Sequence, residues 1–175
     1  MTTMKLGLVQ VYTGNGKGKT TAAIGQAIRA CGHGLKVFMI QFMKGREYGE
    51  LKLARGMKNF TIEQYGLDTF VEKNNPTEED LELAQNGLER ARQVIMSGNY
   101  DIVILDEINV AIDYGLIKLD AVINLIKNKP KGVELILTGR YAPREIIRIA
   151  DLVSEIKEVK HHYTKGIKAR KGIEY

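Results

Sequence analysis

Residues 13–21 read Thr-Gly-Asn-Gly-Lys-Gly-Lys-Thr-Thr, a glycine-rich turn that ends in Gly-Lys-Thr. In such a loop several backbone N–H groups converge on phosphate oxygens, and glycines leave room for that approach. The lysine adds a positive charge for the terminal phosphates, and the following threonine supplies a hydroxyl for Mg²⁺. The sequence therefore predicts a loop that binds a nucleoside triphosphate. Its residues are Gly14, Asn15, Gly16, Lys17, Gly18, Lys19, Thr20 and Thr21.

The spacing of this loop differs by one position from the usual pattern, G-x-x-x-x-G-K-[ST]. That pattern places its first glycine where this chain has Thr13, and the glycine stands instead at 14. An apolar run precedes the loop and an alanine-rich helical pattern follows it, which is the context that such a loop requires. For Lys17 two interpretations stay open, a phosphate contact and a solvated loop residue.

A pair of carboxylates follows another apolar run. Residues 102–105 read Ile-Val-Ile-Leu, and Asp106 and Glu107 come directly after them. Because ligands of open α/β sheets lie at the carboxyl ends of strands, both side chains are expected beside the phosphate loop. Asp106 is predicted to hold the Mg²⁺ that bridges phosphate oxygens, and Glu107 to act as a base or a further metal contact. A plain helix N-cap is the alternative for Asp106.

Thr138-Gly139-Arg140 ends the next apolar run in the same way. This position predicts a guanidinium group at the rim of the site, where it could reach a phosphate. An ion pair between Arg140 and a nearby surface carboxylate is the alternative.

The hydrophobic pattern alternates expected strands with expected helices. The strands are expected at 5–12, 35–42, 59–65, 101–105, 133–138 and 152–159, and the helices at 22–30, 47–55, 78–96, 119–128 and 143–150. This alternation is typical of a parallel sheet covered on both sides. The chain has 175 residues, of which 44% are hydrophobic, so it fits one domain over 1–175. We predict a single-domain α/β P-loop (RecA-like) fold with a mostly parallel sheet and helices on both faces.

Composition limits the compartment and the partners. Cys31 is the only cysteine, which excludes an intramolecular disulfide framework and suits a reducing compartment. No leader pattern and no run of 18 apolar residues is present, so a cytoplasmic protein without a membrane partner is expected. The net charge is +5, and residues 157–171 carry six Lys or Arg against one Glu. This tail lacks the interleaved aromatics of a nucleic-acid groove, so no nucleic-acid partner is predicted, and 157–175 is expected to pack near the site.

Several segments together resemble one family. They are GNGKGKTTAA from Gly14, Gly32-His33-Gly34, VFMIQFMKG from Val37, ILDEIN, LTGR, and the tail from Val159 to Tyr175. They resemble the ATP:corrinoid adenosyltransferases of the P-loop type, also called cob(I)alamin adenosyltransferases. The resemblance covers nearly the whole chain in order, and the displaced glycine at 14 is the form that the loop takes in this family.

The resemblance implies transfer of the 5′-deoxyadenosyl group of ATP to Co(I) of a reduced corrinoid, with release of triphosphate. The corrinoid would be cobalamin, cobinamide or a precursor. It also implies that residues 14–20 bind the triphosphate, that Thr20, Asp106 and Glu107 serve Mg²⁺ (or Mn²⁺), and that Arg140 lies near the nucleotide. A homodimer that receives electrons from reduced flavodoxin or another reductase is implied as well. Co(I) is itself the nucleophile, so no side chain would attack the nucleotide. The catalytic residues would be Lys19, Thr20 and Glu107, which would align the nucleotide and stabilise the leaving triphosphate.

The chain departs from the family pattern in two places. The family keeps aromatic residues after the third strand that hold the corrinoid, usually as Gly-Phe-x-Trp, but residues 65–71 read Tyr-Gly-Leu-Asp-Thr-Phe-Val and the chain has no Trp. Leu67 and Phe70 are the candidates here, and packing of the loop onto the core is the alternative. The chain also begins close to its first strand, without the family's helical extension, so closure would depend on the tail or the loop 66–76.

Two other functions also fit a chain with a phosphate loop. A RecA-like ATPase stimulated by nucleic acid would use the loop, the Asp-Glu pair and the basic tail. A small P-loop kinase would need an arginine-rich lid, which the sequence lacks. His161 and His162 are adjacent in an expected extended segment, so their rings should point in opposite directions and no metal site is predicted there.

Overall fold

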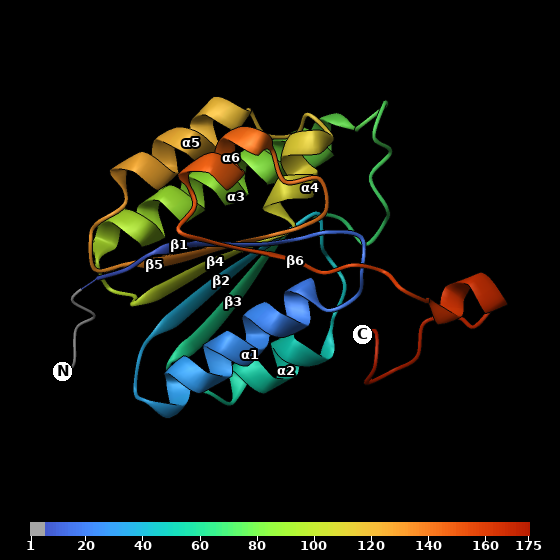
Figure 1. Ribbon diagram of the computed structural model, residues 1–175, viewed down its shortest axis with the longest axis horizontal. Helices are drawn as coiled ribbons and strands as arrows, with labels where there is room; N and C mark the ends of the chain where they lie inside the picture. The colour runs from blue at the N-terminus through green and yellow to red at the C-terminus, as the bar shows by residue number, and fades with distance from the viewer. Residues whose placement is uncertain (1–5) are drawn as a thin grey trace.

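The computed structural model describes residues 6–175, and these form one six-stranded sheet between two layers of helices (Figure 1). The strand order is β3-β2-β4-β5-β1-β6, and every pair is parallel. The strands are β1 (Val9–Thr13), β2 (Val37–Phe42), β3 (Phe60–Tyr65), β4 (Ile102–Asp106), β5 (Glu134–Thr138) and β6 (Leu152–Glu155). The predicted α/β fold with a parallel sheet is confirmed.

Helices cover both faces of the sheet, because parallel neighbours must be joined by crossovers that pass over a face. One layer holds α1 (Lys19–Gly32) and α2 (Gly49–Arg55), and the other holds α3 (Glu78–Ser97), α4 (Ile108–Asp113), α5 (Leu119–Asn128) and α6 (Arg144–Ile149) (Figure 1). A 3₁₀ helix, η1 (His162–Lys165), lies in the C-terminal tail.

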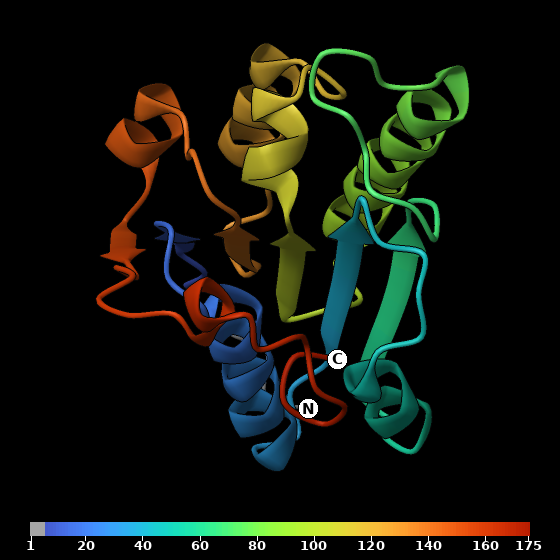
Figure 2. The same ribbon diagram turned by 90° about the vertical axis from the view of Figure 1, so that its right-hand side faces the viewer.

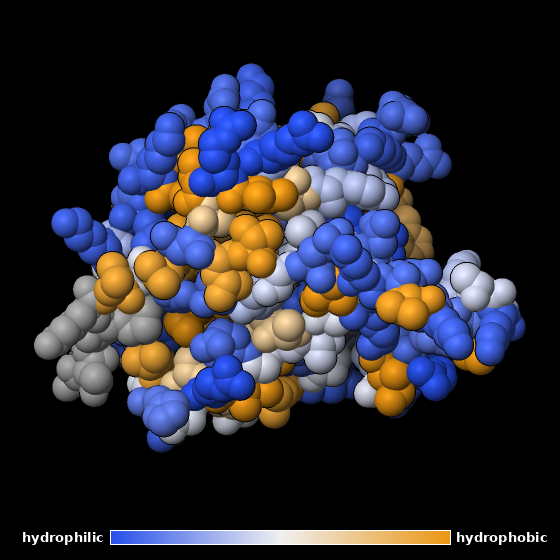
Figure 3. All heavy atoms as spheres, in the orientation of Figure 1, coloured by the Kyte–Doolittle hydropathy of each residue, from blue (hydrophilic) through white to orange (hydrophobic). Residues whose placement is uncertain are grey.

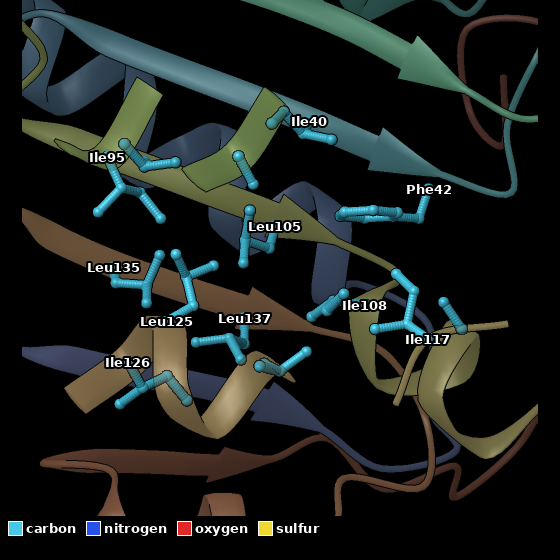
Figure 4. Close-up of a cluster of buried hydrophobic side chains, with 14 of the residues drawn as sticks. Ile40, Phe42, Ile95, Leu105, Ile108, Ile117, Leu125, Ile126, Leu135 and Leu137 are labelled. Carbon is cyan, nitrogen blue, oxygen red and sulfur yellow. The ribbon is translucent and has the colours of Figure 1, made fainter. Parts of the chain in front are cut away.

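The core has two parts, one on each side of the sheet. The larger part packs Leu105, Leu135 and Leu137 of the sheet against side chains such as Ile95 of α3 and Ile126 of α5 (Figure 4). The strands β2, β4 and β5 are buried along their whole length, which explains why most of their residues are apolar. These three strands form the rigid centre that carries the site.

Strand β6 differs from the central strands because all four of its residues are exposed. It is an edge strand, and Leu152 and Val153 remain 43% and 41% exposed. Figure 3 shows apolar side chains among charged ones on the face that carries β6 in Figure 1. An exposed apolar edge is a surface on which another chain can pack.

Three predicted elements differ from the structure by three residues or more at one end, and one helix was not predicted. The first predicted strand began at Lys5, which lies outside the described residues, and β1 begins at Val9. Helix α1 begins at Lys19 rather than 22, since Gly18, with φ 122°, is its N-cap. The last strand ends at Glu155 instead of 159. Helix α4 was not predicted, because six residues are too few to show a helical period.

Candidate nucleotide-binding site

A pocket of about 640 Å³ lies at the N-terminal end of α1, between α1, α2 and the C-terminal tail. Figure 2 shows the tail running across the N-terminal half of α1 and ending between α1 and α2. The pocket is lined by Gly16, Lys17, Gly18, Lys19, Thr20, Thr21, Ile24, Lys44, Tyr48, Gly49, Glu50, Leu53, Glu107, Arg140, His161, Gly172, Ile173, Glu174 and Tyr175. Its volume is typical of small-molecule sites, which span roughly 300–1,000 Å³.

The structure brings together most of the residues predicted for the site. Six residues of the phosphate loop, together with Glu107 and Arg140, line the pocket. Asp106 lies behind it, fully buried but bonded to Thr20. Gly14 and Asn15 lie outside the lining, where the loop meets the chain after β6.

The glycines of the loop have structural reasons that the sequence did not reveal. A Cβ at Gly14, where φ is 96°, would collide with the carbonyl oxygen of Ile156, and one at Gly16 would lie 2.8 Å from that of Lys157. The Gly16 N–H also donates to the Ile156 oxygen at 2.7 Å. Gly18 has open space around it but a φ of 122°, which favours glycine. Close approach of the chain at 156–157 therefore explains two of the three glycines.

The first turn of α1 is suited to an anion. The first N–H groups of a helix have no partner within it, and their partial positive charge attracts phosphate. No acidic residue stands in this turn, and the N-cap Gly18 contributes no side chain. The Lys19 ammonium folds back and donates to the Gly16 oxygen at 2.7 Å. Burial lowers the pKa of Lys19, although the charge of Glu107 opposes that shift.

Four side chains donate hydrogen bonds to the Asp106 carboxylate. Oδ1 accepts from the hydroxyls of Thr20 and Thr138 at 2.8 and 2.7 Å. Oδ2 accepts from the Lys44 ammonium at 2.7 Å and from the Gln41 amide at 3.2 Å. Burial alone would raise the pKa of Asp106, but the Lys44 charge and the hydrogen bonds hold it below its usual value. Asp106 is thus a buried, charged acceptor and does not cap α4, whose N-cap is Glu107.

Glu107 faces the pocket from a left-handed backbone conformation, with φ 61°. Its N–H donates to the Thr138 hydroxyl at 3.0 Å, which fixes the turn after β4. Burial, and next the charge of Asp106, raises the pKa of Glu107. A positive φ in a non-glycine residue is strained and persists where the surroundings impose it, commonly at functional sites.

Three members of this cluster were missed by the sequence analysis as site residues. Gln41 pairs with Asp106 across β2 and β4, Lys44 follows β2 by two residues, and Thr138 ends β5. Each stands at the carboxyl end of a strand beside β4. Lys44 and Thr138 follow or end apolar runs, and this position could have marked them as site residues. The sequence did not show which strands lie beside β4, so it could not place them next to Asp106.

The two candidates in the loop after β3 lie apart from this pocket. Phe70 is 90% exposed, and its ring centre lies 5.6 Å from the Arg46 guanidinium. The backbone of Leu67 packs closely against Gly45, in the turn after β2. Neither residue is among those that line the pocket.

The C-terminal tail reaches the phosphate loop. The Lys17 ammonium donates to the carbonyl oxygen of Ile173 at 3.1 Å. The last turn is held by Arg170, whose N–H and guanidinium donate to Glu174 at 2.8 and 3.2 Å. These bonds lower the pKa of Glu174 to about 2. Residues 172–175 form one wall of the pocket.

The expectation that the rings of His161 and His162 point in opposite directions was wrong. Their rings stack, with centres 4.6 Å apart, because η1 begins at His162 and the backbone there is no longer extended. Of the two, His161 lines the pocket. No group of three His, Cys, Asp or Glu within residues 6–175 is arranged to hold a metal by itself.

A glycine-rich loop between a parallel strand and a helix, next to a buried carboxylate at the end of a second strand, defines a P-loop nucleotide-binding protein. The family model described as ATP:corrinoid adenosyltransferase BtuR/CobO/CobP matches residues 5–175. The chain belongs to this ATP:corrinoid adenosyltransferase family.

Characterised relatives resemble the chain over almost its whole length. The corrinoid adenosyltransferase of Escherichia coli (strain K12) is 37% identical over 175 residues, covering 97% of this chain and 86% of the relative. The corrinoid adenosyltransferase CobA of Salmonella typhimurium is 35% identical, with the same coverage of both chains. The corrinoid adenosyltransferase of Pseudomonas aeruginosa is 35% identical, covering 97% of this chain and 84% of the relative. In the part of the chain described here, no helix is long and apolar enough to cross a membrane.

Proposed function

We propose that the protein transfers the 5′-deoxyadenosyl group of ATP to Co(I) of a reduced corrinoid and releases triphosphate. The observation that carries the proposal is a pocket lined by the glycine-rich loop, the first turn of α1 and Glu107 after β4, in a chain that the family model matches over residues 5–175. The RecA-like ATPase, suggested by the loop, the Asp-Glu pair and the basic tail, and the small kinase, suggested by the loop, are not favoured by the relatives.

The residues of the pocket suit a reaction in which negative charge develops on the leaving group. Co(I) attacks C5′, the bond from C5′ to the triphosphate oxygen breaks, and that oxygen keeps the electron pair. The protein must align the two substrates and stabilise the departing triphosphate. Lys19, Arg140 and the N–H groups of the first turn of α1 would do the latter. The displaced Gly14 would help to turn the nucleotide so that C5′ faces the corrinoid.

Thr20, Glu107 and Asp106 would hold Mg²⁺ (or Mn²⁺). Their oxygens are the ligands that hard cations prefer, and Mg²⁺ is commonly held by one or two carboxylates plus substrate phosphates. Asp106 already accepts four hydrogen bonds, which favours a contact through water or through Thr20. The ion would neutralise charge on the phosphate oxygens.

The C-terminal tail, 157–175, would close the pocket over the nucleotide. This proposal is supported by the bond between Lys17 and Ile173 and by the wall that residues 172–175 form. The exposed Phe70 and the half-buried Leu67, on the loop after β3, would contact the corrinoid. A broad ring that is largely apolar needs such exposed apolar side chains.

The partners follow from the family resemblance. The protein would work in the cytoplasm as a homodimer, with reduced flavodoxin or another reductase as the electron donor. The exposed edge strand β6, with Leu152 and Val153, supports an interface on that side of the sheet.

The direct test is incubation with ATP, Mg²⁺ and chemically reduced cobalamin. We expect the absorbance of a corrinoid with a Co–C bond and one triphosphate per adenosylated corrinoid. Lys19→Ala should reduce the rate at least a hundredfold, since it removes a charge from the leaving triphosphate. Lys58→Ala, at an exposed site before β3, is the matched control and should not change it. Release of ADP and phosphate without a corrinoid, or hydrolysis stimulated by nucleic acid, would contradict the proposal.

A further inference from the structure

We propose that Lys44 binds the triphosphate directly, and that its ammonium passes from Asp106 to phosphate oxygens when the pocket fills. This inference rests on the proposed function for the presence of a triphosphate. It assigns to Lys44 a catalytic role, stabilisation of the leaving group, that the phosphate-loop motif does not contain.

The position of the ammonium supports the assignment. Lys44 lines the pocket, and its Nζ lies 2.7 Å from Asp106 Oδ2 and 3.5 Å from the Thr20 hydroxyl oxygen. Its side chain is only 15% exposed and also lies over the ring of Tyr48, 5.4 Å from the ring centre. Thr20 is the hydroxyl of the phosphate loop, so the ammonium already lies beside the place where phosphate oxygens bind. A lysine has a flexible four-carbon stem, so a small rotation can change its partner.

The backbone around Lys44 is held in a strained shape that directs this side chain into the site. Met43 has a φ of 58°, in the left-handed region that non-glycine residues seldom adopt. The turn crosses the chain after β3 so closely that a Cβ at Gly45 would collide with the Gly66 oxygen, and one at Gly66 with the Lys44 nitrogen. Strain that the surroundings impose in this way commonly marks a functional position.

Lys44 loses its role as the counterion of Asp106 once a divalent cation binds there. The other three donors to this carboxylate, from Gln41, Thr20 and Thr138, are uncharged, so Lys44 provides its positive partner in the empty pocket. A divalent cation bound at Thr20 and Asp106 would repel the ammonium, because both are positive. When nucleotide and metal enter together, Lys44 therefore needs a new negative partner within reach, and the phosphate oxygens provide it.

Binding of inorganic tripolyphosphate, measured calorimetrically without any corrinoid, tests the inference, with Mg²⁺ for the Lys44 and Lys58 single variants and in EDTA for the variants that carry Asp106→Asn, each against the wild-type protein under the same condition. Lys44→Met should weaken binding at least tenfold, whereas Lys58→Met, the exposed control, should change it less than twofold. Asp106→Asn should strengthen binding, because it releases Lys44 and removes a nearby negative charge. Adding Lys44→Met to Asp106→Asn should then weaken binding at least tenfold relative to Asp106→Asn alone.

Binding to folded Lys44→Met within threefold of the wild-type protein would overturn the inference and leave Lys44 as a counterion. If Lys44→Met does not fold because Asp106 is left unpaired, the comparison between Asp106→Asn and the double variant decides, since neither buries a lone carboxylate. A wild-type protein that binds no tripolyphosphate would also overturn it. None of these outcomes depends on Co–C bond formation, so the assay with reduced cobalamin tests the proposed function separately.

Discussion

Asp106 joins four parts of the fold through its two oxygens. Its donors come from α1, β2, β5 and the turn after β2, and the carboxylate has no exposed surface. When a buried carboxylate loses a hydrogen-bond donor, the free-energy cost of removing it from water is no longer offset by that bond. The hydrogen bonds of Asp106 therefore stabilise the fold as well as the site.

Thr138→Val tests this stabilisation with little change in shape. Valine removes the donor to Asp106 and the acceptor for the Glu107 N–H, so we expect a loss of about 2–3 kcal/mol in the free energy of unfolding. Urea unfolding gives the value. Thr61→Val, exposed on β3, is the matched control and should stay within about 0.5 kcal/mol of the wild-type protein. Equal losses for both variants would mean that the Asp106 bonds contribute nothing measurable.

Site residues could be predicted from the sequence where glycines or polar and charged residues follow an apolar run. The phosphate loop, Asp106 with Glu107, and Arg140 were found in this way. Gln41 could not be found, since it is an internal residue of β2 and acts only because β2 lies beside β4. Lys44 stood within a segment quoted for the family resemblance, but its contact with Asp106 depends on the same strand order.

At the scale of the elements, the phosphate loop and the chain after β6 form one packed unit. The Ile156 N–H donates to the Thr13 oxygen at 2.8 Å, and the Ile156 oxygen accepts from Gly16. The sequence places these segments about 140 residues apart, and no local pattern relates them. This explains why the strands and helices were predicted well, whereas the reason for Gly14 and Gly16 was not.

Gly14→Ala should destabilise the protein by about 1–3 kcal/mol, because it combines a φ of 96° with a collision against Ile156. Gly25→Ala is the matched control. Gly25 lies on the exposed side of α1 with open space around it, so alanine there should stabilise by about 0.5–1 kcal/mol. Urea unfolding of both variants measures the difference. A Gly14 variant as stable as the wild-type protein would show that this loop can move away from Ile156.

At the scale of the whole molecule, the C-terminal tail follows the last strand, β6, and takes no part in the sheet. Residues 163–173 are exposed, and the tail reaches the pocket through Lys17 and Ile173. Removing a wall of the pocket should weaken ligand binding without loosening the core, since the tail buries few of its own side chains.

Ending the chain at Ala169 should therefore weaken binding of a non-hydrolysable ATP analogue about tenfold, as measured by calorimetry. The free energy of unfolding should change by less than about 0.5 kcal/mol, because exposed residues are removed. Glu174→Gln, which keeps the wall but weakens the turn held by Arg170, should have a smaller effect on affinity. Unchanged affinity after truncation would exclude a role of the tail in binding the nucleotide.

The position of β1 between β5 and β6 has a consequence for the order in which the protein matures on the ribosome. The phosphate loop, residues 13–21, is synthesised long before its partners, since its strand pairs with residues 135–138 and 152–155, and the Gly16 N–H donates to the Ile156 oxygen. A nascent chain must expose the loop without these partners until residues 135–156 have been synthesised. Such distant pairings also slow folding. Nucleotide binding at the assembled loop therefore becomes possible only after residue 156 has left the ribosome.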